Sequence, residues 1–187
     1  GWSIKNALKQ IVTSRTFRSA STAPLGVTDK DPENLYLSYY TPRRLDAEAI
    51  MDSVNSLARD EFQRGVYLKV IRNKLDPFLA IFNLPIPTTT MSKRDSTNVP
   101  AQALSMMNGE FVQKASIQWA KRIAIATKGQ SIEAQIRSLF LDAYARSPHE
   151  TEIENLFEYY KSMEDSDTAL KNIAFALMTT KEFIYVY

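Results

Sequence analysis

The last third of the chain carries an apolar pattern that a helix satisfies and a strand does not. Apolar residues recur there every three or four positions in three successive segments, with short polar links between them. The three stripes are formed by Ile132, Ile136, Leu139, Phe140 and Ala143, by Ile153, Leu156, Phe157 and Tyr160, and by Leu170, Ile173, Ala174, Leu177 and Phe183. Residues 147–150, Ser-Pro-His-Glu, form a predicted capping box before the second segment. Because short links favour antiparallel neighbours, the pattern predicts a C-terminal antiparallel three-helix unit.

Helical spacing also occurs in the first two thirds of the chain. The predicted helices there cover residues 2–14, 41–62, 77–82 and 100–127, and Asn108-Gly109 is expected to break or kink the last of them. We expect Thr41 to cap the second helix and Trp2 to pack at the start of the first. Residues 66–72 are rich in β-branched and aromatic side chains and are predicted to be extended, although no partner strand is evident. The chain is therefore predicted to be an all-α, multi-helix domain with at least five helices.

A long segment without a helical signal, residues 84–99, interrupts this series. Prolines at 85, 87 and 100 exclude a continuous helix up to Pro100, because proline lacks an amide donor and restricts the residue before it. Apolar flanks would fix both ends of the segment in the core, whereas its hydroxyls and charges would each cost ~1–3 kcal/mol if they were buried unpaired. We therefore predict a long ordered central loop, in which Arg94 turns inward and pairs with Asp46 or Glu48.

Composition limits the domain count and the classes of partner. With 187 residues, 44% of them hydrophobic, the chain is predicted to be a single helical domain over residues 1–187. A subdivision into an irregular helical part, residues 1–95, and a helical bundle, residues 96–187, is also predicted. The 23 basic and 21 acidic residues are interspersed and leave a net charge of +2, so we expect no nucleic-acid partner. No apolar run reaches the ~20 residues that span a bilayer, so we expect no membrane insertion by this segment.

Metal and cofactor chemistry has little basis in the sequence. The chain has no cysteine, which excludes thiolate zinc sites and iron–sulfur clusters, and its single histidine, His149, is expected to be exposed in a first helical turn. Acidic pairs such as Asp46 with Asp52 are typical of helix surfaces and do not by themselves indicate acid–base catalysis. We therefore predict no metal site, no cofactor and no catalytic residue. Whether the domain contributes to an enzyme stays open, with a non-enzymatic role favoured.

Two sets of polar residues are candidates for ligand binding. Arg43, Arg44, Asp46 and Glu48 place two cations and two anions within six positions, and an arginine there can bind a carboxylate or phosphate bidentately. Arg94, Ser96, Thr97 and Gln102 form the second group, a polar cluster beside a predicted helix N-terminus. Each group also has a structural explanation. Helix capping and surface pairing account for the first, and a loop that satisfies its own backbone accounts for the second.

Several short motifs resemble one family in their order along the chain. They are Gly1-Trp2-Ser3-Ile4-Lys5, Ser14-Arg15-Thr16-Phe17-Arg18, Asp31-Pro32-Glu33-Asn34, Arg43-Arg44-Leu45-Asp46-Ala47-Glu48, Arg72-Asn73, Pro100-Ala101-Gln102-Ala103-Leu104, Asn108, Arg146-Ser147-Pro148 and Glu182-Phe183. Through these motifs the chain resembles the planctomycete-enriched family called domain of unknown function 1553, and it corresponds to the C-terminal part of that domain. Arg72 and Asn108, which lie in these motifs, complete the set of candidate binding residues.

The resemblance implies a cellular setting but no activity. Proteins of this family are typically exported and multidomain, which implies an extracytoplasmic location at the cell surface or in the periplasm. Two functions stay open. One is a non-catalytic binding module that contacts upstream domains of the same protein, another exported protein or a glycan through the central loop and residues 43–48. The alternative is part of a hydrolase-like or redox-associated enzyme whose other active-site residues lie upstream of residue 1.

Overall fold

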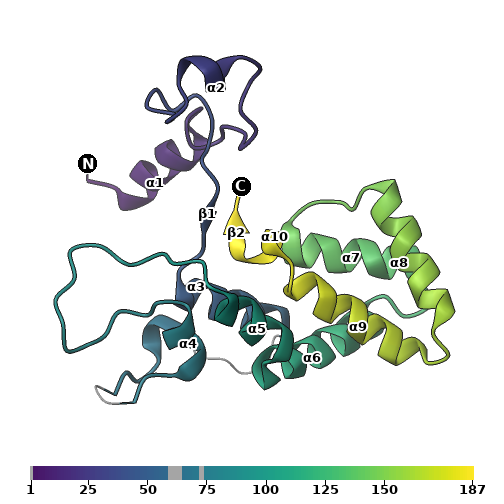
Figure 1. Ribbon diagram of the computed structural model, residues 1–187. Coiled ribbons are helices and arrows are strands. Elements are labelled where there is room, and N and C mark those ends of the chain that lie inside the picture. The colour runs from purple at the N-terminus through teal and green to yellow at the C-terminus, as the bar shows by residue number, and fades with distance from the viewer. Residues whose placement is uncertain (1, 59–64, 72–73) are drawn as a thin grey trace. The chain divides into compact units, whose positions relative to one another are not determined.

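The computed structural model describes residues 2–58, 65–71 and 74–187 of the chain (Figure 1). In these residues helices predominate, and the prediction of an all-α domain with at least five helices is confirmed. The helices are α1 (Ile4–Thr13), α2 (Val27–Lys30), α3 (Ala47–Ala58), the 3-10 helix η1 (Gly65–Tyr67), α4 (Pro77–Ile81), α5 (Pro100–Asn108), α6 (Glu110–Ala126), α7 (Ile132–Tyr144), α8 (Glu150–Ser162), α9 (Ser166–Met178) and α10 (Lys181–Ile184). Two short antiparallel strands, β1 (Arg43–Arg44) and β2 (Tyr185–Val186), accompany them.

The chain divides into two compact units, which are described separately. Unit 1 consists of Gly1–Arg44 with Tyr185–Tyr187, and unit 2 consists of Leu45–Ile184. These boundaries follow the β1–β2 pair, which joins the two ends of unit 1. The subdivision expected near residue 95 stays a prediction.

Unit 2 contains the hydrophobic core, with α6 at its centre. Helix α6 packs against α9 and α3, and α7, α8 and α9 contact one another (Figure 1). The largest side chains that the core encloses completely are Trp119, Phe82, Ile50, Met106, Ile136, Leu139 and Ile173. The apolar stripes of α3, α6, α7 and α9 therefore face inward, as their helical spacing predicts.

Local signals explain where several helices begin and end. Side chains cap four of them: Ser3 accepts from the amide of Asn6, Asp76 from Leu79, Ser131 from Ala134, and Asp165 from Thr168. Gly109 separates α5 from α6, which confirms the predicted break. A Cβ atom at Gly109 would lie 2.3 Å from the carbonyl oxygen of Ser105, so only glycine fits this junction.

The predicted start of the second helix is wrong. The helix was expected from Thr41, but α3 begins at Ala47 because Arg43 and Arg44 pair as a strand with Val186 and Tyr185. This pairing partner lies more than a hundred positions away, so no local signal reveals it. The predicted C-terminal end, residues 59–62, lies outside the described residues.

Three further local expectations need correction. Trp2 does not pack at the start of α1 but is fully exposed. Of residues 66–72, which were predicted to be extended, 66 and 67 belong to η1, and residue 72 lies outside the described residues. Ile71 makes an isolated bridge with Lys74. The N-cap of α8 is His149 rather than Ser147, and the carboxylate of Glu152 accepts the His149 amide at 2.7 Å. Proline at 148 therefore precedes the cap instead of opening the helix.

Unit 1 is held together by polar groups. Among its described residues only Asp31 and Asn34 are buried. The Asp31 carboxylate accepts the amides of Leu35 and Tyr36 at 2.8 and 2.9 Å, and the Asn34 carboxamide accepts the Ser38 amide at 2.8 Å. The Asp31-Pro32-Glu33-Asn34 motif therefore fixes its own loop, as Asx turns do.

Candidate functional site

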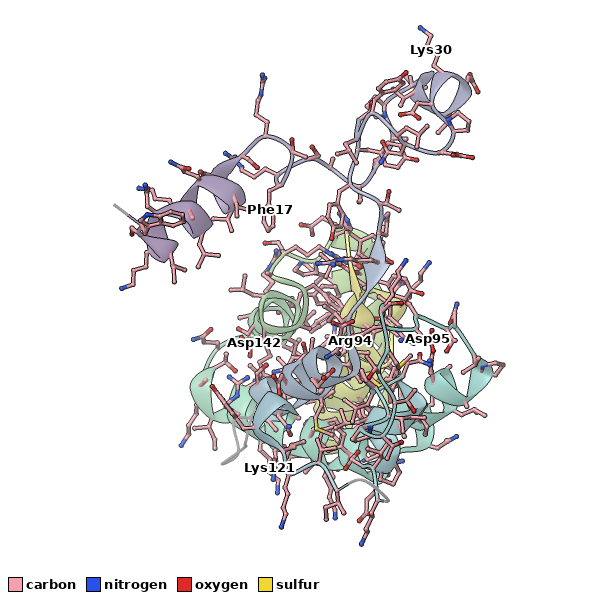
Figure 2. All side chains as sticks on the ribbon, turned by 90° about the vertical axis from the view of Figure 1, so that its left-hand side faces the viewer. Phe17, Lys30, Arg94, Asp95, Lys121 and Asp142 are labelled. Atoms are coloured by element: carbon pink, nitrogen blue, oxygen red, sulfur yellow. The ribbon has the colours of Figure 1, made fainter. Side chains whose placement is uncertain are left out.

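Arg94 in the central loop forms a bidentate ion pair with Glu48 in α3. Its Nη1 and Nη2 atoms donate to the two carboxylate oxygens of Glu48 at 2.7 and 2.9 Å, and Nη1 lies 3.7 Å from Asp46. Figure 2 labels Arg94. The pairing of Arg94 with the start of this helix is therefore confirmed. The hydrogen bonds from Arg94 lower the pKa of Glu48 below its ordinary value, because they favour the charged carboxylate. Both charges are satisfied within the protein.

Replacement of Arg94 by alanine is expected to lower the free energy of unfolding by about 1 kcal/mol. This exceeds the ~0.5 kcal/mol of a neutral surface change, because the mostly buried Glu48 carboxylate loses two charge-assisted bonds. Urea denaturation of Arg94→Ala, Glu48→Ala and the double variant should show non-additive losses. The neighbouring Lys93→Ala is the matched control and should change little. Additive effects of the Arg94 and Glu48 changes would contradict a specific pair.

A second polar network fixes the far end of the loop. Gln102 is buried in α5, and its amide nitrogen donates to the carbonyl of Ile81 at 3.0 Å and to the side-chain oxygen of Asn83 at 3.3 Å. That Asn83 oxygen also accepts the amide and hydroxyl of Thr97, at 3.3 and 3.0 Å. Asn83 adopts a left-handed φ of 68°, which asparagine tolerates. The loop thus satisfies its own polar groups here, so a ligand is not needed to explain these residues.

The remaining predicted binding residues are dispersed. The structure joins Asp46, Glu48 and Arg94 in one cluster and Thr97 with Gln102 in another. Ser96 and Asn108 are exposed, and Arg72 lies outside the described residues. Arg43 and Arg44 both belong to β1 in unit 1, where Arg44 is half-buried and Arg43 lines a surface cavity. A binding role for these ten residues stays a prediction.

The most connected arginine of the described chain was not among the predicted sites. Arg146 donates to Glu182 from Nε at 2.6 Å and Nη2 at 2.8 Å, and to Glu152 from Nη1 and Nη2 at 2.8 Å each. Nη1 also donates to the carbonyl of Ser147 at 3.1 Å, so all five N–H groups are used. The guanidinium lies 5.2 Å from the ring centroid of Phe140. Arg146 thereby links α7, α8 and α10, and it has no donor left for a ligand.

Stability should fall in acid through the Arg146 cluster. Hydrogen bonds from Arg146 lower the pKa of Glu152 from 4.5 to about 2. A carboxylate whose pKa is lower in the folded state stabilises the fold above its unfolded pKa, and this contribution is lost as the pH falls from about 4.5 toward about 2. Urea denaturation at about pH 5 and about pH 3 should therefore show a larger loss for the wild-type chain than for Glu152→Gln. If the wild-type chain and Glu152→Gln lost equal stability between these pH values, Glu152 would not be the source of the acid sensitivity.

The described residues offer little for catalysis or metal binding. Within residues 2–58, 65–71 and 74–187, no three histidine, cysteine, aspartate or glutamate side chains converge as metal ligands. His149 is exposed at the N-cap of α8. Arg122, a further arginine in α6, pairs with Asp142 at 2.5 Å and donates to the carbonyl of Leu57. None of the described helices has the length and apolar character needed to cross a membrane.

Helix α1 presents a different kind of candidate surface. Ile4, Leu8, Ile11 and Val12 form one stripe along the helix, yet none of its ten residues is buried. Ile4 is 77% exposed and Leu8 55% exposed. An amphipathic helix of a folded protein normally turns such a stripe toward other apolar groups. We refer to these four residues as the α1 face.

Comparison with known proteins gives a family and no activity. A family model described as PSD1, a protein of unknown function (DUF1553), matches residues 1–61 and 54–160, which together make up most of the chain. Comparison with curated proteins gave no match, and comparison with solved structures gave none either. The family match agrees with the resemblance that the ordered motifs indicate. The chain belongs to the DUF1553 family of proteins of unknown function.

Proposed function

We propose that this chain is a non-catalytic interaction module that docks onto another protein domain through the α1 face. The observation that carries the proposal is that α1 is amphipathic and leaves all of its ten residues unburied. A ten-residue helix is marginally stable in water without tertiary packing. Covering Ile4, Leu8, Ile11 and Val12 would contribute roughly 1.5–3 kcal/mol for each side chain fully removed from water. A partner surface would therefore stabilise the helix as well as bind it.

The charges around the α1 face suggest the chemistry of the partner. Residues 1–28 contain Lys5, Lys9, Arg15 and Arg18 but no aspartate or glutamate. A complementary surface is apolar at its centre and carries carboxylates at its rim, because opposite charges speed association and exclude wrong partners. An apolar helical surface with acidic borders fits this description.

The proposal keeps the partners expected from the family resemblance. These are upstream domains of the same protein or another exported protein, in an extracytoplasmic location. Unit 2 would act as the scaffold in this arrangement. We further propose that its last three long helices, α7, α8 and α9, pack antiparallel in that scaffold. Arg94, Glu48 and Gln102 would hold the central loop on that scaffold, since their polar groups are engaged with one another or with the loop.

Site-specific photo-crosslinking tests the docking face in the protein as its host produces it. A benzoylphenylalanine at position 8 lies on the α1 face, whereas the same residue at position 10 lies on the opposite side of the helix. We expect position 8 to crosslink to one defined acidic protein segment, and Ile4→Glu to abolish that product. Position 10 should give little product. Equal yields from both positions, or products with lipid alone, would contradict the proposal.

A further inference from the structure

Unit 1 contains a surface cavity of about 520 Å³ that the docking proposal does not use. Its lining includes three aromatic rings, those of Phe17, Tyr39 and Tyr40, together with Thr41 and Arg43. This volume lies within the ~300–1,000 Å³ that is usual for small-molecule sites. The cavity is therefore large enough to hold a sugar unit.

Arg43 is the only charged residue among those that line this cavity. Its guanidinium makes no hydrogen bond or ion pair with the described residues, in contrast to Arg94, Arg122 and Arg146. Pairing of the Arg43 backbone with Val186 fixes the position of the residue. A guanidinium held in this way has the planar donor geometry that binds a carboxylate with two parallel hydrogen bonds.

The part of the wall formed by residues 37–41 is held in place before any ligand arrives. The Asn34 side chain donates to the carbonyl of Tyr39 at 2.7 Å, and the Tyr40 amide donates to the carbonyl of Ala20 at 2.9 Å. Leu37, also in this wall, has a left-handed φ of 53°, a strained conformation for a leucine. Such strain persists only where the surrounding bonds enforce it, and it is concentrated at functional sites. A rigid wall reduces the entropy lost on binding.

We propose that this cavity binds a uronate unit of an acidic polysaccharide, with Arg43 holding the carboxylate. The rings of Phe17, Tyr39 and Tyr40 offer flat apolar surfaces to the C–H face of a sugar. The phenol hydroxyls of Tyr39 and Tyr40 can each donate and accept a hydrogen bond, which matches sugar hydroxyls. A single cation suits a monoanionic carboxylate, whereas a phosphate dianion would be expected to meet more than one.

Calorimetric titration of the chain with trigalacturonate, and with neutral galactotriose as the uncharged probe, tests this assignment. We expect trigalacturonate to bind at least tenfold more tightly than galactotriose. Arg43→Gln should remove that preference, and Tyr40→Ala should weaken the binding of both probes. Lys30→Gln is the matched control, because Lys30 is an exposed cation of α2 that does not line the cavity (Figure 2). Circular dichroism of each variant verifies that the fold is retained.

Three results would overturn the assignment. They are equal affinity of the chain for the two sugars, an equal loss of affinity in Lys30→Gln and Arg43→Gln, and displacement of trigalacturonate by inorganic phosphate at equal concentration. Ile11 lines this cavity and also belongs to the α1 face, so the sugar test uses Arg43 and the docking test uses position 8. Sugar binding and partner docking can therefore fail independently.

Discussion

Replacing Trp119 with alanine should lower the free energy of unfolding by about 3–5 kcal/mol. Trp119 is fully buried at the centre of α6, so its loss removes a large apolar side chain and leaves a cavity that the surrounding helices fill only in part. Its indole nitrogen also donates to the Asp142 carboxylate at 3.2 Å. Because a domain is typically stable by only ~5–15 kcal/mol, this change should bring the chain close to unfolding.

Two variants in the same helix separate the causes. Trp119→Phe keeps most of the ring volume but loses the indole donor, so we expect a smaller loss than in Trp119→Ala. Ile125→Ala removes a side chain that is 76% exposed and should change stability by less than ~0.5 kcal/mol. Urea denaturation followed by far-ultraviolet circular dichroism measures all three. Similar losses at positions 119 and 125 would contradict the placement of the core.

Replacing Arg146 with alanine should cost about 2–3 kcal/mol. The change leaves two carboxylates, Glu152 and Glu182, facing each other without a cation, and breaking a buried pair in this way costs ~3–5 kcal/mol. We expect less here because each side chain of the cluster is about one-third exposed, which lets water screen the charges.

Controls for Arg146 distinguish its geometry from its charge. Arg146→Lys keeps a cation but cannot make the two bidentate contacts, so it should restore only part of the loss. Combining Arg146→Ala with Glu182→Gln should cost less than the sum of the single changes, because the double variant no longer carries the unpaired Glu182 charge. If Arg146→Lys were as stable as the wild-type chain, the bidentate contacts of the guanidinium would not be needed.

Sequence patterns predicted the helices of unit 2 well, because local spacing determines them. The stripes that begin at Ile132 and Leu170 and the break at Gly109 are all readable within a few residues. The start of α3 could not be read in this way, since β1 forms only when the chain returns to Val186. Nonlocal pairing of this kind overrides a local helix signal.

Contacts at the candidate sites were predictable only where the sequence itself shows charged groups that must find a partner. A charged loop between apolar flanks requires internal partners, which predicts the pairing of Arg94 with Asp46 or Glu48, and the structure contains the pair with Glu48. The Arg146 cluster gives no such signal, although Arg146 and Glu182 each lie in a short motif of the sequence. These two residues lie 36 positions apart, and nothing in either motif indicates the other. The sequence also does not predict the cavity beside Arg43, because the geometry of the loops creates it.

Hydrogen exchange of the α1 amides tests the proposed docking most directly. The measurement compares two samples. The first is the chain of residues 1–187 by itself, and the second is the protein purified from its host together with the proteins that copurify with it. We predict rapid exchange over Ile4–Thr13 in the first sample, because an uncovered helix of this length opens readily, and strong protection in the second. Exchange that is equally rapid in both samples would contradict the claim that a protein partner covers the α1 face.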